Sequence, residues 1–202
     1  GYTPWGTYLT CEENWAGYLI NRTPRPREQS KYGVATGSTR YRWETAGGEY
    51  ARFDVTPTAN DATGDYRNEA NTFGWVVEID PFNPKSTPKK RTALGRTAHE
   101  GAWVAPVKPG RPVVIYMGDD STNQYVYKFV TADVYHPRKS TGDMLDRGTL
   151  FVAVFNADGT GEWRALEFAD PQFKAAMAAY AATDPTFVPF RSQAEVLINT
   201  RL

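Results

Sequence analysis

Three short motifs carry the residue types that could bind metal ions. Each begins or ends a strand-like run: Cys11-Glu12-Glu13-Asn14, His99-Glu100-Gly101 and Gly118-Asp119-Asp120. Loops at strand ends are where a β scaffold presents its ligands. Carboxylate oxygens suit hard cations such as calcium, whereas thiolate and imidazole suit softer ions such as iron and zinc. Together these residue types indicate a mixed-metal site.

The first motif also has an ordinary structural interpretation. Cys11 is the only cysteine of the chain, and a free cysteine is more often a small buried hydrophobe than a ligand. Glu12 and Glu13 are adjacent, so in a strand they would point to opposite faces and at most one would usually face a given site. The residues alone leave both interpretations open.

The other acidic motifs are similarly ambiguous. Asp119-Asp120 and a fourth, weaker motif, Asn60-Asp61, are typical of turns, and His99 could pair with Glu100 or cap a turn. With only two histidines in the chain, a histidine-rich zinc site is excluded. The H-E-x-x-H, G-x-S-x-G, Walker and Rossmann glycine motifs are all absent. On the residues alone, a carboxylate metal site on a β protein is the functional hypothesis.

Short strands joined by tight turns must position these motifs. We predict strands in the segments "TYLT", "FGWVVEID", Ala102–Ala105, Pro112–Met117 and "QYVYKFV". The strongest hairpin has apolar alternation on both sides of Asn156–Gly161. Strands at spacings of roughly 8 to 12 residues are typical of a sandwich, barrel or propeller.

Only the C-terminal part of the chain has helical signals. Asp170–Asp184 begins with Asp-Pro, an N-cap followed by a residue that suits the first turn, and its alanine-rich face is expected to pack in the core. A second short helix is expected near Phe190–Asn199, with Ser192 as its N-cap and Glu195 three residues later. The long polar stretch Arg22–Glu49 has no core periodicity, so surface loops with isolated short strands are expected there.

Composition limits the classes of function. The 202 residues include 23 basic and 23 acidic side chains, and this balance argues against a dominant nucleic-acid or anionic-membrane partner. No run approaches the roughly 20 apolar residues of a membrane span. A single cysteine excludes an intrachain disulfide.

Taken together, the motifs resemble those of the PhoX family of alkaline phosphatases. The resemblance rests on "TPWGTYLTCEENW", "FGWVVEIDPFNP", "KRTALGRTAHEGAWV", "YMGDD", "YVYKFV", "GTLFVAVFNADGTGEW" and "AEVLINTRL", which occur in family order from Thr3 to Leu202. It implies that residues 1–202 are a single interior fragment of a longer phosphatase domain, with both flanks missing. It implies a mainly β fold that is part of a β-propeller, with long loop insertions and one or two helices near the C-terminal end.

The resemblance also implies a chemistry and its residues. Members of the family hydrolyse phosphate monoesters with a cluster of Ca²⁺ and Fe³⁺. By matching motifs, Cys11 is the expected iron ligand, and Glu12, Glu13, Glu100 and Asp120 are candidate metal ligands. Which neighbour of each acidic pair binds is not fixed by the motif. Arg201 is a candidate for contacting phosphate, or equally a structural neighbour of a missing segment, and the fragment alone is expected to be inactive.

Two other functions remain open on the sequence. One is a non-catalytic calcium-binding propeller module, which a chain with all three acidic motifs intact argues against. The other is a calcium-dependent propeller lactonase or esterase, whose site would need no thiolate. For the phosphatase we expect twin-arginine export to the periplasm or outside the cell, phosphate monoesters as substrates and a monomer without a membrane span.

Overall fold

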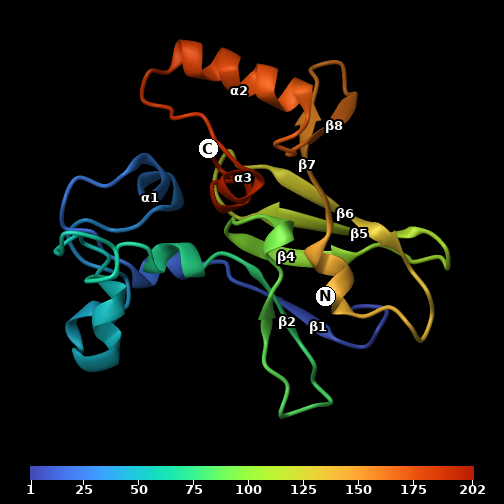
Figure 1. The fold of residues 1–202 in the computed structure, drawn as a ribbon, viewed down its shortest axis with the longest axis horizontal. Helices are drawn as coiled ribbons and strands as arrows, with labels where there is room; N and C mark the ends of the chain where they lie inside the picture. Colours follow the sequence, from blue (N-terminus) through green and yellow to red (C-terminus); the bar gives the residue numbers. More distant parts are fainter.

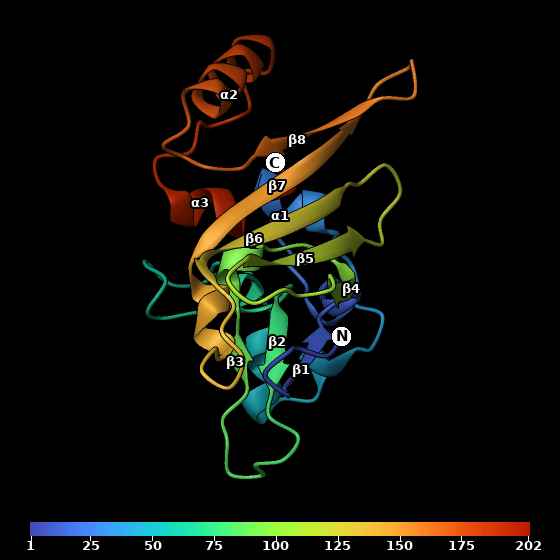
Figure 2. The same ribbon diagram turned by 90° about the vertical axis from the view of Figure 1, so that its right-hand side faces the viewer.

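The chain forms two antiparallel sheets with helices at their margins. A computed structural model describes residues 1–202 (Figures 1 and 2). The first sheet has the order β1-β2-β3 and the second the order β4-β5-β6-β7-β8. The strands are β1 (Tyr8–Cys11), β2 (Val76–Ile79), β3 (Lys89–Lys90), β4 (His99–Val104), β5 (Pro112–Asp119), β6 (Val126–Val134), β7 (Gly148–Phe155) and β8 (Gly161–Ala165).

Three α-helices and several short 3₁₀ helices complete the fold. The α-helices are α1 (Arg27–Tyr32), α2 (Pro171–Thr183) and α3 (Gln193–Ile198). The 3₁₀ helices are Trp15–Tyr18, Trp43–Thr45, Gly48–Phe53, Glu69–Thr72, Thr92–Leu94 and Gly142–Asp146. No helix has both the length and the hydropathy needed to cross a membrane.

The second sheet is a simple meander in which each strand pairs with the next one in sequence. In β5 the side chains of Val113, Ile115 and Met117 are buried in strict alternation, as a half-buried strand requires. The hairpin that joins β7 to β8 turns through Gly159, whose φ of 84° favours glycine. The expected strands and the expected hairpin are therefore present.

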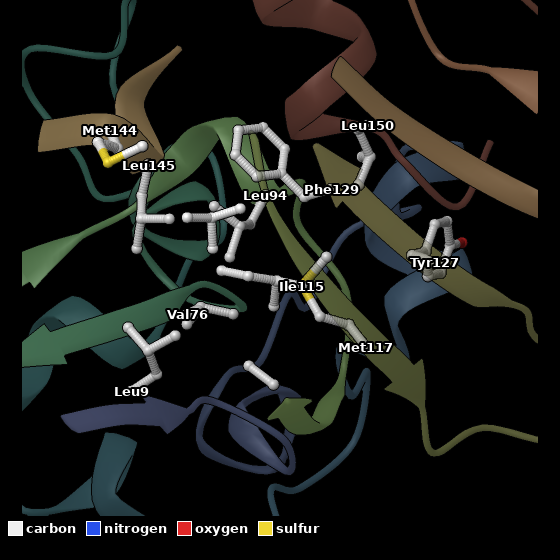
Figure 3. Close-up of a cluster of buried hydrophobic side chains, with 12 residues drawn as sticks. Leu9, Val76, Leu94, Ile115, Met117, Tyr127, Phe129, Met144, Leu145 and Leu150 are labelled. Carbon is white, nitrogen blue, oxygen red and sulfur yellow. The ribbon is translucent and has the colours of Figure 1, made fainter. Parts of the chain in front are cut away.

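The main core lies between the two sheets (Figure 3). Leu9 and Val76 come from the first sheet, and Ile115 and Phe129 come from the second. All four side chains are at most 1% exposed, and burial of this kind contributes about 25 cal/mol for each Å² of apolar surface. This shared core fixes how the end of β1 sits against the start of β4 and the end of β5.

The two predicted C-terminal helices are confirmed, together with their N-caps. Asp170 accepts hydrogen bonds from the backbone N–H groups of Gln172 and Phe173, and Ser192 accepts one from Glu195. The alanine-rich face of α2 was expected in the core, but no residue of α2 is buried. That expectation is wrong because α2 lies at the edge of the molecule, beside β7 and β8 (Figure 1).

The polar stretch from Arg22 to Glu49 is more ordered than expected. It contains α1 and part of a series of 3₁₀ helices, and it helps to build a second core of buried side chains: Trp15, Leu19, Tyr32, Val34, Phe53, Val55 and Ala70. The sequence interpretation missed this core because its members have neither the 3.6-residue nor the 2-residue spacing of a regular element. No closed barrel or propeller is formed by these two sheets.

Candidate metal centre

The three acidic motifs meet where the first sheet adjoins the second. Beyond the end of β1, the Glu12 N–H donates to Trp75 O, and Glu12 O accepts from the His99 N–H at 3.2 Å. On the other side of β4, the Asp120 N–H donates to Ala98 O at 3.1 Å. The backbone therefore brings together the end of β1, the start of β4 and the end of β5.

Glu12 and Glu13 face different surroundings. Glu12 Oε1 accepts from Lys90 Nζ at 2.7 Å, and Glu12 Oε2 accepts from the Trp75 N–H at 2.9 Å. Glu12 thus ties the end of β1 to β3 and to the residue that precedes β2. Glu13 Oε1 accepts only from Asn14 Nδ2, at 3.0 Å, and no basic side chain pairs with Glu13.

Glu13, Glu100 and Asp120 form a group of like charges, which we call the acidic edge. Asp120, within hydrogen-bonding reach, raises the pKa of Glu13; partial burial and the charges of Asp120 and Glu100 raise it further, while Asn14 lowers it. None of the three carboxylates forms an ion pair with a lysine, arginine or histidine. Crowded carboxylates without a basic partner are the electrostatic environment that a cation would relieve.

Glu100 is exposed through an irregularity of the sheet. His99 pairs with Asp119 and Gly101 pairs with Gly118, so Glu100 is an extra residue in a β-bulge between β4 and β5. Bulges re-aim side chains and are common next to active sites. The His99 side chain is completely buried, whereas Glu100 is exposed.

Asp119 and Asp120 also differ in their partners. The Asp119 side chain is fully buried and is paired with Arg201, whereas Asp120 is exposed beside Glu13. The sequence interpretation did not identify Asp119 as the partner of Arg201. No local signal could have done so, because the partner lies in the last residues of the chain.

Cys11 lies on the core side of β1. Its thiol packs against the main core, as a partly buried hydrophobic side chain would. Burial raises the pKa of the Cys11 thiol; the charged amino group of Gly1 opposes this shift, and the Glu13 carboxylate adds to it. A thiol of this kind is protonated at neutral pH, and binding a metal would have to displace the proton.

His99 is a buried neutral side chain rather than an exposed ligand. Burial lowers the pKa of His99 to about 4. Its Nε2 lies 2.9 Å from Gly95 O and donates to it, since a carbonyl can only accept. The Nδ1 atom has no protein partner. Neither the pairing with Glu100 nor the turn cap suggested by the sequence describes this arrangement.

The donor atoms of the acidic edge fit a hard cation in part. Ca²⁺ takes six to eight oxygen ligands, and carboxylates are oxygen donors of the kind that it prefers. No group of three or more His, Cys, Asp or Glu side chains lies close enough to hold a metal ion by itself. The edge therefore offers an open and partial set of oxygen ligands, and Cys11 is the only thiol near it.

Two other features lie outside the acidic edge. The Asp61 Oδ1 atom accepts from the N–H and hydroxyl of Thr63, so the Asn60-Asp61 motif is a surface turn. A cavity of about 940 Å³ lies between α2, α3 and the last strands, and hydrophobic residues make up 16 of the 26 that line it. Arg201 and the turn after Asp120 form part of its wall.

Comparisons with known proteins agree on one relationship. The sequence model of a family described as "Alkaline phosphatase PhoX" matches residues 1–202. A solved structure described as Pseudomonas fluorescens PhoX in complex with vanadate, a transition state analogue, is 40% identical in sequence and superposes with a TM-score of 0.81. The match covers 100% of this chain and 33% of that one, so the chain spans about a third of its solved relative. No curated protein matches the chain.

Proposed function

This chain belongs to the PhoX family of alkaline phosphatases, and from that premise we propose that its acidic edge is part of the metal centre of a phosphate monoester hydrolase. One observation carries the proposal. Glu13 and Asp120 come together from two separate segments, and the charge of Glu100, in a third, acts on Glu13; none of the three has a basic partner, while their neighbours Glu12 and Asp119 are paired with Lys90 and Arg201.

The proposal assigns different tasks to the members of each acidic pair. Glu13 and Asp120 hold Ca²⁺ together with Glu100, whereas Glu12 and Asp119 fix the backbone on which Glu13 and Asp120 stand. The solved relative is described as a complex with vanadate, a transition state analogue, which supports a phosphoryl-transfer site in this family. The remaining Ca²⁺ ligands come from outside the acidic edge.

Cys11 completes the proposed centre as the ligand of Fe³⁺. Thiolate is a soft ligand that suits iron, and carboxylates suit calcium. A phosphate monoester is a dianion, and bound cations supply the positive charge that its hydrolysis requires. In this proposal Cys11 supplies the thiolate, and the Glu13 carboxylate lies close enough to influence the pKa of Cys11.

We further propose that the five-stranded sheet is one blade of a propeller. The chain exposes 11725 Å², whereas a compact domain of its mass, 22.6 kDa, exposes roughly 9,500 Å². Trp103, Tyr116 and Trp163 are between 38% and 71% exposed. Trp103 and Tyr116 are cross-strand partners on one face of the sheet, and a neighbouring blade would cover that face. Export and a monomeric state are proposed on the family relationship alone.

Metal analysis and phosphatase assays of the intact protein test the proposed function. Iron and calcium are measured for each chain, and hydrolysis of p-nitrophenyl phosphate is followed before and after chelation. We expect both metals and a loss of activity on chelation that added calcium restores. Calcium without iron, together with hydrolysis of a lactone but not of a phosphate monoester, would overturn the proposal in favour of an esterase.

A further inference from the structure

Arg201 joins the end of the chain to the end of β5. Its side chain is 4% exposed and pairs with the fully buried carboxylate of Asp119. Arg201 Nε donates to Asp119 Oδ2 at 2.6 Å, and Arg201 Nη2 donates to Asp119 Oδ1. Two parallel hydrogen bonds from a guanidinium to a carboxylate fix both distance and orientation.

The same guanidinium also binds the residue on the other side of Asp120. Arg201 Nη2 donates to Ser121 Oγ at 2.7 Å, and the Ser121 N–H donates to Asp119 Oδ1 at 3.2 Å. Asp120 therefore stands between two residues held by one side chain. Its own N–H donates to Ala98 O, and its carboxyl lies within hydrogen-bonding reach of Glu13.

The guanidinium is itself held in place from behind. Arg201 Nη1 donates to Lys31 O at 3.2 Å, and its central carbon lies 5.1 Å from the ring centroid of Tyr32. The Tyr32 hydroxyl lies within hydrogen-bonding distance of Ile198 O, in α3, at 3.2 Å. Four of the five N–H groups of the guanidinium are therefore directed at protein partners, and its position is fixed before any ligand binds.

We propose that Arg201 is a positioning residue, which presents the Asp120 carboxyl to Glu13 by binding Asp119 and Ser121, and so sets the affinity of the acidic edge for Ca²⁺. The inference rests on the proposed function. It differs from the expectation that Arg201 contacts phosphate, because a guanidinium with its donors directed at Asp119, Ser121 and Lys31 has little left to offer a phosphate.

Arg201→Lys is the informative variant, because lysine keeps the charge but loses the planar two-point contact. The intact protein is freed of metal and titrated with CaCl₂ alone. We expect the Kd for calcium to rise on the order of tenfold, as when a group that orients a metal ligand is lost. Raising the calcium concentration should restore the activity, with the substrate KM at saturating calcium unchanged.

A matched control is available in Arg91. It is also buried, and its guanidinium pairs with Glu78 at 2.6 Å and Asp146 at 2.7 Å, away from the acidic edge. Arg91→Lys should lower the unfolding temperature but leave the Kd for calcium unchanged. If Arg201→Lys fails to fold, Ser121→Ala removes a single hydrogen bond of the contact and should still raise the calcium Kd by roughly two- to threefold.

Three outcomes would overturn the inference. An Arg201→Lys variant with the calcium affinity of the unmodified protein would show that Arg201 does not position a ligand. An unchanged calcium affinity with weaker vanadate binding and a higher substrate KM would show a direct phosphate contact. An unmodified protein that binds no calcium would reject the proposed function itself, and the inference with it.

Discussion

Glu13 and Asp120 approach within hydrogen-bonding reach of each other, although one follows a strand of the three-stranded sheet and the other follows a strand of the five-stranded sheet. Two acidic side chains in this arrangement repel each other when both are ionised. The arrangement is retained because the backbones of Glu12, His99 and Asp120 are joined through the β4 segment. The repulsion between the two carboxylates lowers the stability of the metal-free protein, whereas a bound cation would relieve it. Substitutions at the two residues can measure the two effects separately.

Glu13→Gln and Asp120→Asn should each weaken calcium binding without destabilising the metal-free protein. Each variant removes a ligand charge, so we expect the calcium Kd to rise at least tenfold. Because repulsion is also relieved, the free energy of unfolding in chelator should stay within about 0.5 kcal/mol of the starting value or rise. Calorimetric calcium titration and urea unfolding test the two effects.

Glu12→Gln is the matched control for those two variants. It removes the charge that pairs with Lys90 and weakens the acceptor of the Trp75 N–H. We expect a loss of about 1–2 kcal/mol of stability in chelator and a calcium Kd within about twofold of the starting value. A larger loss of calcium affinity in Glu12→Gln than in Glu13→Gln would contradict the assignment.

Cys11→Ser tests the iron ligand. A serine hydroxyl is close in size to a thiol, but it stays protonated at neutral pH and is then a poor ligand for iron. The intact variant should lose most of its iron and most of its phosphatase activity, while it keeps its fold. Iron measured by elemental analysis decides the matter, because full iron content in the variant would reject Cys11 as a ligand.

His99 should make the metal-free protein less stable in mild acid. Burial lowers its pKa from 6.5 to about 4, so between these values the unfolded state binds more protons than the folded state. Stability is therefore highest above pH 6.5 and falls as the pH drops towards 4, by about 3 kcal/mol in total from this group. His99→Gln can still donate to Gly95 and does not titrate, so it should remove that part of the pH dependence.

The experiment is urea unfolding at pH 7.5 and pH 5, with chelator present so that protons do not compete with metal. We expect a smaller difference between the two pH values for His99→Gln than for the unmodified protein. An identical difference in both would show that His99 does not titrate as a buried neutral group.

The Asp184 carboxylate should hold α2 near α1 at all but strongly acidic pH, where it becomes protonated and loses its pair with Arg27. Hydrogen bonds from Thr186 and then the Arg27 guanidinium lower the pKa of Asp184, and Arg27 Nη1 lies 2.5 Å from its Oδ2. A carboxyl with a lowered pKa stabilises the fold above its unfolded value of 3.8 and loses that contribution as the pH falls below it.

Asp184→Asn should therefore show faster amide hydrogen exchange in α2 at pH 6, and a smaller change on acidification than the unmodified protein. Arg27→Gln serves as the second variant, because it removes the same pair from the other side. Equal protection of α2 in all three proteins would reject the pairing as the contact that holds α2.

Strands and capped helices were predictable because their signals are local. The alternation in β5, the turn residues of the β7–β8 hairpin and the Asp170 and Ser192 caps all lie within one element of sequence. The core around Tyr32 was not predictable from periodicity, since it is assembled from irregular segments. Its members come together only in the tertiary structure, so this core could be recognised only there.

The acidic motifs could be found in the sequence, but which residue of each pair is ion-paired and which is free of a basic partner could not. Whether Glu12 or Glu13 is paired depends on Lys90, which reaches Glu12 from another strand. Whether Asp119 or Asp120 is exposed depends on Arg201, which belongs to the segment after α3. Neither partner can be inferred from spacing, because both are set by the register between distant segments.

The order of the strands has a consequence for the route by which the chain folds. Contacts within the β4–β8 meander join neighbouring strands, and such local contacts form early because little loop entropy is lost. The acidic edge instead requires the first strand, the start of β4 and the segment after α3 to arrive together. We therefore expect the acidic edge to be among the last parts of the chain to assemble. A cation that binds there would favour the finished fold over its partly folded precursors by mass action.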